Sequence, residues 1–253
     1  MNPLLKIYVN VILKRLSSLL PAVLLVTCLA QTSTGSDAWR RTPQQVTTER
    51  SDPVRKKIVT ARSTLFDQLI GNDQPLDQPA SQDMTTDLIR EVPPQPELPV
   101  STSDTIVEAT FESHLVHLSE TKRSIYTELL FRVTNILTNN QKSARVGGTL
   151  SILKPGGSII FPNGRTKAYA LADNRDLFGP RANYLLFLNY NAATDSYAVV
   201  QSWILVNGKY YPNSPEIIDQ LKAGQLQHVD ETREQLISDL KQKLVASQSS
   251  AAR

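Results

Sequence analysis

The stretch from Gly147 to Leu188, GGTLSILKPGGSIIFPNGRTKAYALADNRDLFGPRANYLLFL, decides the fold. Short apolar runs alternate in it with turns rich in proline and glycine, a rhythm typical of an antiparallel sheet that closes on itself. Pro155-Gly156-Gly157 suits a type II turn, because proline presets φ at one central position and glycine accepts the positive φ at the next. The stretch therefore predicts a small β domain without specifying a chemistry.

A second turn in this stretch, Pro162-Asn163-Gly164-Arg165, suits a β-hairpin. As a type I′ turn it places Asn163 and Gly164 at the central positions with positive φ, which matches the twist of the flanking strands. The alternative is a type I turn, in which Pro162 and Asn163 are central and Gly164 is fourth. In either case residues 158–161 are expected to pair with residues 166–171.

Further strands follow outward in both directions. The clearest is SIYTELLFRVTNIL at 124–137, in which one face carries Ile125, Leu129, Phe131 and Val133. In the strand expected at 105–118, one side carries Val107, Ala109, Phe111 and Leu115. The other expected strands are 149–153, 183–190, 197–206 and, after an Asn207-Gly208 turn, 209–211. The sequence thus predicts a mainly β fold: a small closed or partly open antiparallel barrel, OB-like, over residues 105–212.

The N-terminal 30 residues have the features of a secretory signal peptide. Three basic residues, Lys6, Lys14 and Arg15, precede the apolar run LSSLLPAVLLVTCLA, and no acid occurs. We expect cleavage after Ala30. Two alternatives remain: lipidation at Cys28, and retention as an anchor, although the run is shorter than the roughly 20 residues that span a bilayer. Contact with a membrane is expected only through an uncleaved leader.

Removal of the leader changes the charge and cysteine content of the chain. The chain has 27 basic and 24 acidic residues, so the mature protein would have 24 of each. Zero formal charge gives no electrostatic basis for binding nucleic acid. The single cysteine, Cys28, leaves with the leader, so no disulfide or thiol chemistry is expected. The predicted localisation is secreted or periplasmic.

Residues 31–104 read as a polar, proline-rich linker with one short helix. The helix is expected near 54–70, capped by Asp52 and Pro53, with its basic residues on other faces than an apolar stripe of Val54, Ile58, Ala61, Leu65 and Leu69. We expect it to lie on the barrel or to form part of the linker; the alternative is docking on an anionic membrane. The rest of the N-terminal region is expected to be disordered.

Residues 213–247 are predicted to form C-terminal helices. A short helix is expected from Ser214-Pro215 to Gly224, and a longer one begins at Asp230. The apolar stripe of the longer helix consists of Val229, Leu236, Ile237, Leu240 and Leu244. A stripe of this length is typical of a helix packed on its own domain.

The order of SIYTELLFRVTNIL, GGTLSILKPGGSIIFPNGRTKAYALA, ANYLLFLNY and NGKYYP resembles a family of exported bacterial proteins of uncharacterised function. The resemblance covers about 107–212 and implies a leader, a variable polar region and a small β-barrel domain. The chain departs from the family pattern at Leu129-Leu130 and Asn139-Asn140. A weaker likeness is to the netrin-like OB-fold modules of tissue metalloproteinase inhibitors. Those modules act through an N-terminal cysteine and disulfides that the mature chain lacks, so their mechanism is not carried over.

Candidate catalytic and metal-binding residues give no complete set in the sequence. His114 and His117 form H-x-x-H, but on a strand they point to opposite faces, and no third ligand lies near to complete a site. His228 is expected to be solvated. The carboxylates expected on the solvent side of the strands are Glu108, Glu112, Glu120 and Glu128. We expect no catalytic residue, no metal and no cofactor.

Aromatic residues are the one feature that rises above this background. Seven of the eight tyrosines lie between Tyr126 and Tyr211, together with Trp203. Although most suit half-buried strands, OB-like barrels hold ligands on a sheet face, which makes binding candidates of Tyr126, Tyr169, Tyr184 and Trp203. The favoured hypothesis is an exported, non-enzymatic module that binds an envelope or extracellular protein, peptide or glycan. The alternative is an extracellular hydrolase or hydrolase inhibitor.

Overall fold

The computed structural model describes residues 44–45, 53, 55–70, 74–78, 96–169, 178–179, 181–213, 220, 224, 226–228 and 231–251. Its elements in chain order are β1 (Gln44–Gln45), α4 (Lys56–Ile70), β2 (Thr105–Leu118), β3 (Ile125–Asn139), β4 (Thr149–Pro155), β5 (Gly157–Ile160), β6 (Thr166–Tyr169), β7 (Asn183–Asn191), β8 (Ser196–Val206), β9 (Lys209–Pro212) and α6 (Arg233–Ala251). The expected leader, Asp52 and the helix starts at Ser214 and Asp230 lie outside the described residues.

The fold is mainly β and forms a partly closed antiparallel barrel, as the sequence predicts. The main sheet has six strands in the order β4-β3-β2-β7-β8-β9, and β4 also pairs with β8 through the parallel partners Ile152 and Tyr197. That pair joins β4, β3, β2, β7 and β8 into a ring and leaves β9 outside it. A small second sheet has the order β1-β5-β6. Every strand of the predicted domain is present, with ends within two residues of those expected.

The barrel interior is filled by the inward side chains of the five ring strands and by one plug. The plug is Phe178, from the segment before β7, which is fully buried against the rings of Phe111, Phe131 and Tyr184. The other members of this core include Val107, Ala109, Leu129, Val133, Leu150, Ile152, Leu186 and Leu188. The apolar periodicity of the sequence therefore describes a closed core.

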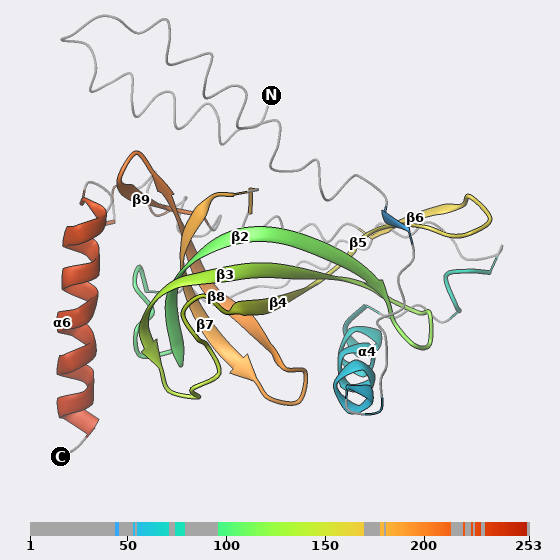
Figure 1. Cartoon of the computed structure of the whole chain (residues 1–253), viewed down its shortest axis with the longest axis horizontal. Helices are drawn as coiled ribbons and strands as arrows, with labels where there is room; N and C mark the ends of the chain where they lie inside the picture. Colours follow the sequence, from blue (N-terminus) through green and yellow to red (C-terminus); the bar gives the residue numbers. More distant parts are fainter. Residues whose placement is uncertain are drawn as a thin grey trace, which may run out of the picture.

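Strand β7 is buried on both faces, which explains why its sequence YLLFL shows no alternation. Tyr184, Leu186 and Leu188 face the barrel interior, whereas Leu185 and Phe187 belong to a second core under α6. All five are 0% exposed. The second core also holds Leu98, Ile106, Trp203, Tyr210, Leu236, Ile237 and Leu240. Figure 1 shows α6 at one end of the sheet and α4 at the other, below the long β2–β3 hairpin.

The expected position of Leu115 on the core side of β2 is wrong. Pairing of β2 with β3 shifts by one residue between Phe111 and Ser113, so the alternation of the strand reverses after this bulge. Val116 and Leu118 consequently become buried, and Leu115 is 41% exposed. His114 and His117 lie beyond the bulge on one regular stretch of strand, three residues apart, and so point to opposite faces as expected.

Helix α4 forms as predicted but buries a different face. The expected stripe ends at Leu69, which is 39% exposed, while the buried residues are Val59, Arg62, Ser63 and Phe66. These four residues also follow helical spacing, but on a different face of the helix from the expected stripe. Arg62 lies on a face other than the expected stripe, as predicted, but that face is the buried one. Apolar periodicity could not reveal this face because half of its members are polar.

Helix α6 packs on its own domain, as its stripe predicts. Leu236, Ile237 and Leu240 are buried against β8 and β9 residues, and Leu244 packs partly against the same core. The helix begins at Arg233. A backbone bridge between Lys209 and Thr232 ties the segment before the helix to the start of β9.

The hairpin at Pro162-Asn163-Gly164-Arg165 is the type I alternative, so the favoured type I′ turn is wrong. The amide of Gly164 donates to the carbonyl of Phe161, which makes Pro162 and Asn163 the central residues, and Asn163 is not among the residues with positive φ. Gly164 has a φ of 80° in the fourth position. The Asn207-Gly208 turn, by contrast, has positive φ at both residues, 50° and 76°, as a type I′ turn requires.

These two turns predict different responses to the same substitution. Asn163→Gly should lower the free energy of unfolding by about 0.5–1 kcal/mol, because glycine gains freedom in the unfolded chain and the contact from the Arg165 amide to the Asn163 side chain is lost. Asn207→Gly should be nearly neutral, because relief of the left-handed backbone offsets that cost. Thermal unfolding of both variants tests the assignment; equal losses would contradict it.

Candidate functional site

Helix α4 packs on the face of β3 and β4 of the barrel. In OB-like barrels the face of the second and third strands, together with the loops after the first and fourth strands, binds ligands. Here those barrel strands are β3 and β4, and those loops are residues 119–124 and 192–195. We call this surface the α4 groove. The polar contacts of Arg62, Ser63 and Asp67 join α4 to these strands or loops.

Arg62 is the central contact between α4 and the groove. Its guanidinium donates from Nη1 to Oε1 of Glu128 at 3.1 Å, from Nε to the carbonyl of Thr194 at 2.8 Å and from Nη2 to the carbonyl of Asp195 at 3.1 Å. Only 1% of the residue is exposed. A buried guanidinium is tolerated only when its donors are paired. The groove thus presents one carboxylate and two carbonyl oxygens to an arginine.

Glu128, on β3, is held by partners from three elements. Its Oε1 accepts from Arg62 and from Ser151 Oγ at 2.6 Å, and its Oε2 lies 3.1 Å from His117 Nε2. Burial alone raises the pKa of Glu128, but hydrogen bonds from His117 and Ser151 and the charges of Arg62 and His117 outweigh it and lower that pKa to about 2. Glu128 is therefore a fixed anion in the floor of the groove.

Aromatic packing completes the floor of the groove. The ring of Phe66 on α4 stacks on that of Tyr126, with centroids 4.7 Å apart and planes 9° from parallel. His117 lies beside the same tyrosine at 5.2 Å. Such ring pairs add about 0.5–1.5 kcal/mol to the burial of their apolar area. Tyr126, a binding candidate from the sequence, therefore lies in the groove.

Loop 119–124 forms hydrogen bonds with the same helix. The Glu120 amide donates to Ser63 Oγ at 3.0 Å, while Thr121 Oγ1 and Ser124 Oγ donate to the two oxygens of Asp67 at 2.6 and 2.7 Å. Ser63 and Asp67 stand one residue after Arg62 and Phe66, so all four side chains point to one side of α4. The buried residues of α4, which are Val59, Arg62, Ser63 and Phe66, have the i, i+3, i+4, i+7 pattern of a helix that docks through one face.

The low pKa of Glu128 predicts that docking of α4 weakens in acid. A carboxyl whose folded-state pKa is depressed contributes stability that is present above its ordinary value of 4.5 and is lost as the pH falls toward 2. The protection factors of the α4 amides, which correct for the intrinsic pH dependence of exchange, should therefore be high at neutral pH and fall below about pH 4.5. The variant Glu128→Gln should lose most of this pH dependence; an unchanged profile would show that other groups cause it.

The remaining binding candidates lie elsewhere. Tyr184 is in the barrel interior, where its hydroxyl accepts from the Gly179 amide at 2.6 Å, and Trp203 is buried in the core under α6. Both are 0% exposed. The Tyr169 side chain lies outside the described residues; its backbone pairs with Gly157. The structure therefore brings only Tyr126 of these four into the α4 groove.

A second buried carboxylate, Glu108, fastens α6 to the sheet. Arg233 donates to it from Nε and Nη2, both at 2.7 Å, and Tyr210 Oη and Asn135 Nδ2 donate to it at 2.5 and 2.8 Å. Burial raises the pKa of Glu108, but these donors outweigh it and lower that pKa below its ordinary value. Glu108 and Glu128 are 3% and 7% exposed, so the expectation that they face solvent is wrong. Glu112 and Glu120 are exposed as expected.

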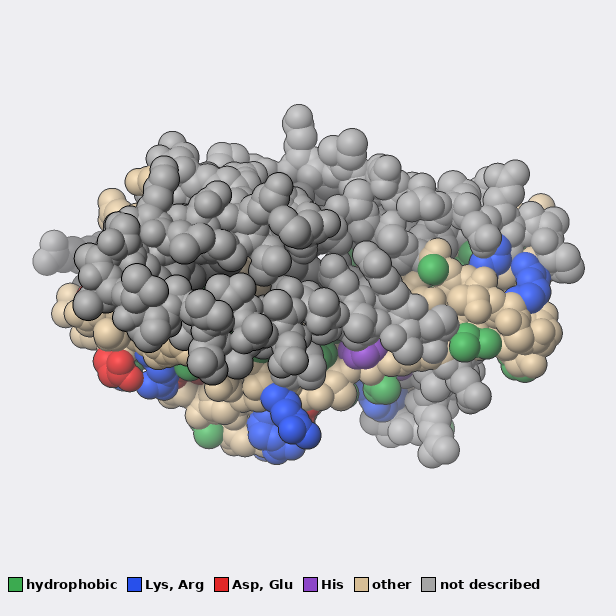
Figure 2. Space-filling model, turned by 90° about the horizontal axis from the view of Figure 1, so that it is seen from above, with side chains coloured by type: hydrophobic (Ala, Val, Ile, Leu, Met, Phe, Trp, Pro, Cys, Tyr) green, Lys and Arg blue, Asp and Glu red, His purple; other side chains and the backbone are tan. Residues whose placement is uncertain are grey.

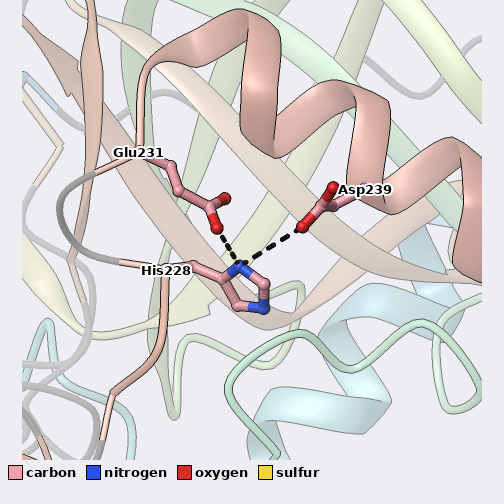
Figure 3. A group of neighbouring side chains, drawn as sticks. All are labelled: His228, Glu231 and Asp239. Carbon is pink, nitrogen blue, oxygen red and sulfur yellow. Dashed lines mark hydrogen bonds and ion pairs between the residues drawn. The ribbon is translucent and has the colours of Figure 1, made fainter.

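A third polar cluster, His228, Glu231 and Asp239, lies at the start of α6 (Figure 3). His228 Nδ1 is 2.9 Å from Glu231 Oε1 and 3.9 Å from Asp239 Oδ2. The residue is 8% exposed, so the expectation that His228 is solvated is wrong. The signal in the sequence is His-x-x-Glu followed by an aspartate eight residues later, a spacing of potential metal ligands that drew no prediction.

Exposed apolar surface offers no competing site among the described residues. The large hydrophobic side chains that are exposed there, Leu69, Leu115, Val146 and Val245, belong to different elements. On the described part of the face in Figure 2, hydrophobic side chains are scattered, and lysines and arginines form separate clusters. Single exposed apolar residues are ordinary in globular proteins.

Comparison with known proteins supplies no further assignment. A scan against protein-family models, a search of curated proteins and a search of solved structures each found no match. Among the described residues, neither α4 nor α6 is long and apolar enough to cross a membrane.

Proposed function

We propose that the chain is an exported, non-enzymatic binding module, and that the α4 groove is its binding surface for a helical peptide or protein segment at the envelope or outside the cell. The observation that supports this most is the occupancy of the groove by α4. A surface that OB-like barrels use for ligands here holds a helix through side chains, backbone carbonyls and an aromatic stack. On this proposal α4 is an internal ligand that shows which partner fits.

The contacts of α4 support an arginine-bearing helix as that partner. Its arginine meets Glu128 and the carbonyls of residues 194–195, and an aromatic ring four residues later stacks on Tyr126. Serine and aspartate next to these positions pair with loop 119–124. A peptide is favoured over a glycan, because the groove recognises a guanidinium and a ring presented one helical turn apart.

Catalysis by the two buried carboxylates is not supported by their surroundings. Both oxygens of Glu108 and of Glu128 accept hydrogen bonds from neighbouring side chains, and both groups have lowered pKa values. A general acid at neutral pH needs a raised pKa and access to substrate. These two carboxylates act as structural anions.

The proposal is tested by offering α4 in trans to the full chain. The double variant Arg62→Met, Phe66→Ala is expected to vacate the groove, and a fluorescent peptide of residues 53–70 should then bind it by anisotropy. Wild type should bind the peptide far more weakly, because its tethered helix competes at an effective concentration in the millimolar range. A peptide with Arg62→Met should lose about tenfold or more in affinity, whereas one with Lys57→Met, an exposed position, should not.

If the double variant keeps native hydrogen-exchange protection in β2–β9 but binds no peptide, the proposal is wrong. If the double variant does not fold, a protease site inserted at 81–90 of the wild-type chain replaces it. After cleavage of the folded protein, the α4 fragment should exchange with excess labelled peptide. If the α4 fragment dissociates only when the barrel unfolds, α4 is part of the core and is not a ligand.

A further inference from the structure

We propose that His228, Glu231 and Asp239 bind a divalent transition-metal ion, with Zn²⁺ as the representative. One atom from each residue, an imidazole nitrogen and two carboxylate oxygens, lies within 4.8 Å of the others (Figure 3). In a tetrahedral site, metal–ligand bonds of 2.0–2.2 Å place neighbouring ligand atoms about 3.3–3.6 Å apart. The separations from His228 Nδ1, 2.9 Å to Glu231 and 3.9 Å to Asp239, lie on either side of that range, so small movements of the two carboxylates would complete the site. This site is independent of the α4 groove.

A buried oxygen without a hydrogen-bond partner points to the same site. Oε2 of Glu231 is inaccessible to solvent and accepts no hydrogen bond from the residues that the structure describes. A carboxylate oxygen in that state is costly unless a cation or donor satisfies it. The imidazole beside it is held in place, since the backbone amides of Gln227 and His228 donate to the Glu97 carboxylate at 2.8–3.1 Å. The site thus combines a buried, fixed imidazole with an unsatisfied carboxylate oxygen.

The ligand set selects the class of metal. Imidazole nitrogen with carboxylate oxygen suits Zn²⁺ and its first-row neighbours, whereas Mg²⁺ and Ca²⁺ prefer oxygen ligands alone. Three protein ligands leave at least one position of a four-coordinate ion for water. The ion would connect the segment before α6 to the second turn of the helix, so its first effect is to stabilise the docking of α6.

The contact of Lys243 with His228 favours the tautomer of the imidazole that opposes metal binding. Its ammonium donates to His228 Nε2 at 3.1 Å, so Nδ1 carries the ring proton and donates to Glu231. Metal binding at Nδ1 moves that proton to Nε2, and the exposed Lys243 side chain then loses its acceptor and swings into solvent. Replacing Lys243 with glutamine supplies an acceptor for Nε2–H. It should therefore favour the metal-bound tautomer.

The test is titration of the metal-free full chain with Zn²⁺ by calorimetry, with Co²⁺ absorption as a second probe. We expect one ion per chain, a loss of about tenfold or more in affinity for His228→Ala and for Asp239→Asn, and tighter binding for Lys243→Gln. The matched control is Glu234→Gln, an exposed acid in the first turn of the same helix, which should change the affinity by less than about twofold. Excess Mg²⁺ should not compete.

Zn²⁺ at about a hundred times its Kd should also raise Tm by roughly 5–10 °C, and this shift should vanish in Asp239→Asn. Because Asp239 is 44% exposed, that variant should fold normally and so keeps the test decisive. Equal affinity of wild type and Asp239→Asn, or an equal loss in Glu234→Gln, would overturn the site. Binding of Mg²⁺ as tight as that of Zn²⁺ would overturn the assignment of the metal class.

Discussion

Replacing Arg62 with methionine is expected to weaken the docking of α4 by about 3–5 kcal/mol, because it leaves Glu128 as a buried charge without its cation. Two carbonyl oxygens, at Thr194 and Asp195, lose their donor in the same change. Methionine retains the unbranched, flexible shape of the stem, so the cost reports the lost guanidinium more than a cavity. Hydrogen exchange of the α4 amides measures it, as a rate increase of roughly two to four orders of magnitude if the helix opens alone.

Two further variants make this result interpretable. Lys57→Met removes an exposed cation from the same helix and should change exchange by less than about 0.5 kcal/mol. The double variant Arg62→Met, Glu128→Gln should recover part of the loss, because the unpaired charge is gone. A global fall in stability equal to the local one would show that α4 and the barrel unfold together, which contradicts the proposed role of α4 as a removable ligand.

Gly157→Ala is expected to lower the free energy of unfolding by about 3 kcal/mol or more, from strain and overpacking together. Gly157 has a φ of 141°, and a Cβ there would lie 2.7 Å from Val116 Cγ1 and 2.8 Å from Thr127 Oγ1. The residue stands where the chain leaves β4 and enters the second sheet. Neither neighbour can retreat easily, since both sit on paired strands of the β2–β3 hairpin.

The control for this prediction is Gly164→Ala. Gly164 also has positive φ, at 80°, but a Cβ there has no atom within 4 Å. Its replacement should cost only the backbone term of about 1–2 kcal/mol. Chemical denaturation of both variants provides the comparison. Equal losses would mean that backbone strain alone, and not the close approach to Val116 and Thr127, explains the need for glycine at 157.

The barrel could be predicted from the sequence because each of its strands is indicated by a local sequence pattern. Alternation in β3, the glycine turns and the YLLFL run each fix a strand without reference to distant residues. Pro155-Gly156-Gly157 was expected to turn the chain, and Gly156 does have a positive φ of 90°. The pairing of β5 with β6 is confirmed, whereas the pairing of β5 with β1 in a separate sheet could not be predicted.

The α4 groove could not be predicted, because its decisive residues break the usual rules of burial. Arg62 and Glu128 are charged residues, which the sequence alone predicts to be exposed. They lie 66 residues apart in the chain, and only the fold brings them together. Each alone would be costly inside a protein, and only their pairing makes burial tolerable. Such a pair leaves no periodic signal in either segment. The same holds for Glu108 and Arg233, which are 125 residues apart.

The single parallel pair Ile152–Tyr197 is the only direct strand pairing between β4 and β8 in the described part of the barrel. One bridge gives little resistance to parting of these two strands, so this junction is the mechanically weakest line of the ring. Arg62 spans it: Glu128, which Ser151 of β4 also contacts, lies on one side, and the carbonyls of the β7–β8 loop lie on the other. Departure of α4 would therefore loosen the wall of the barrel as well as uncover its groove. A partner that takes the place of the helix would meet a surface able to widen, and pulling on the N-terminal segment would open the domain from that line.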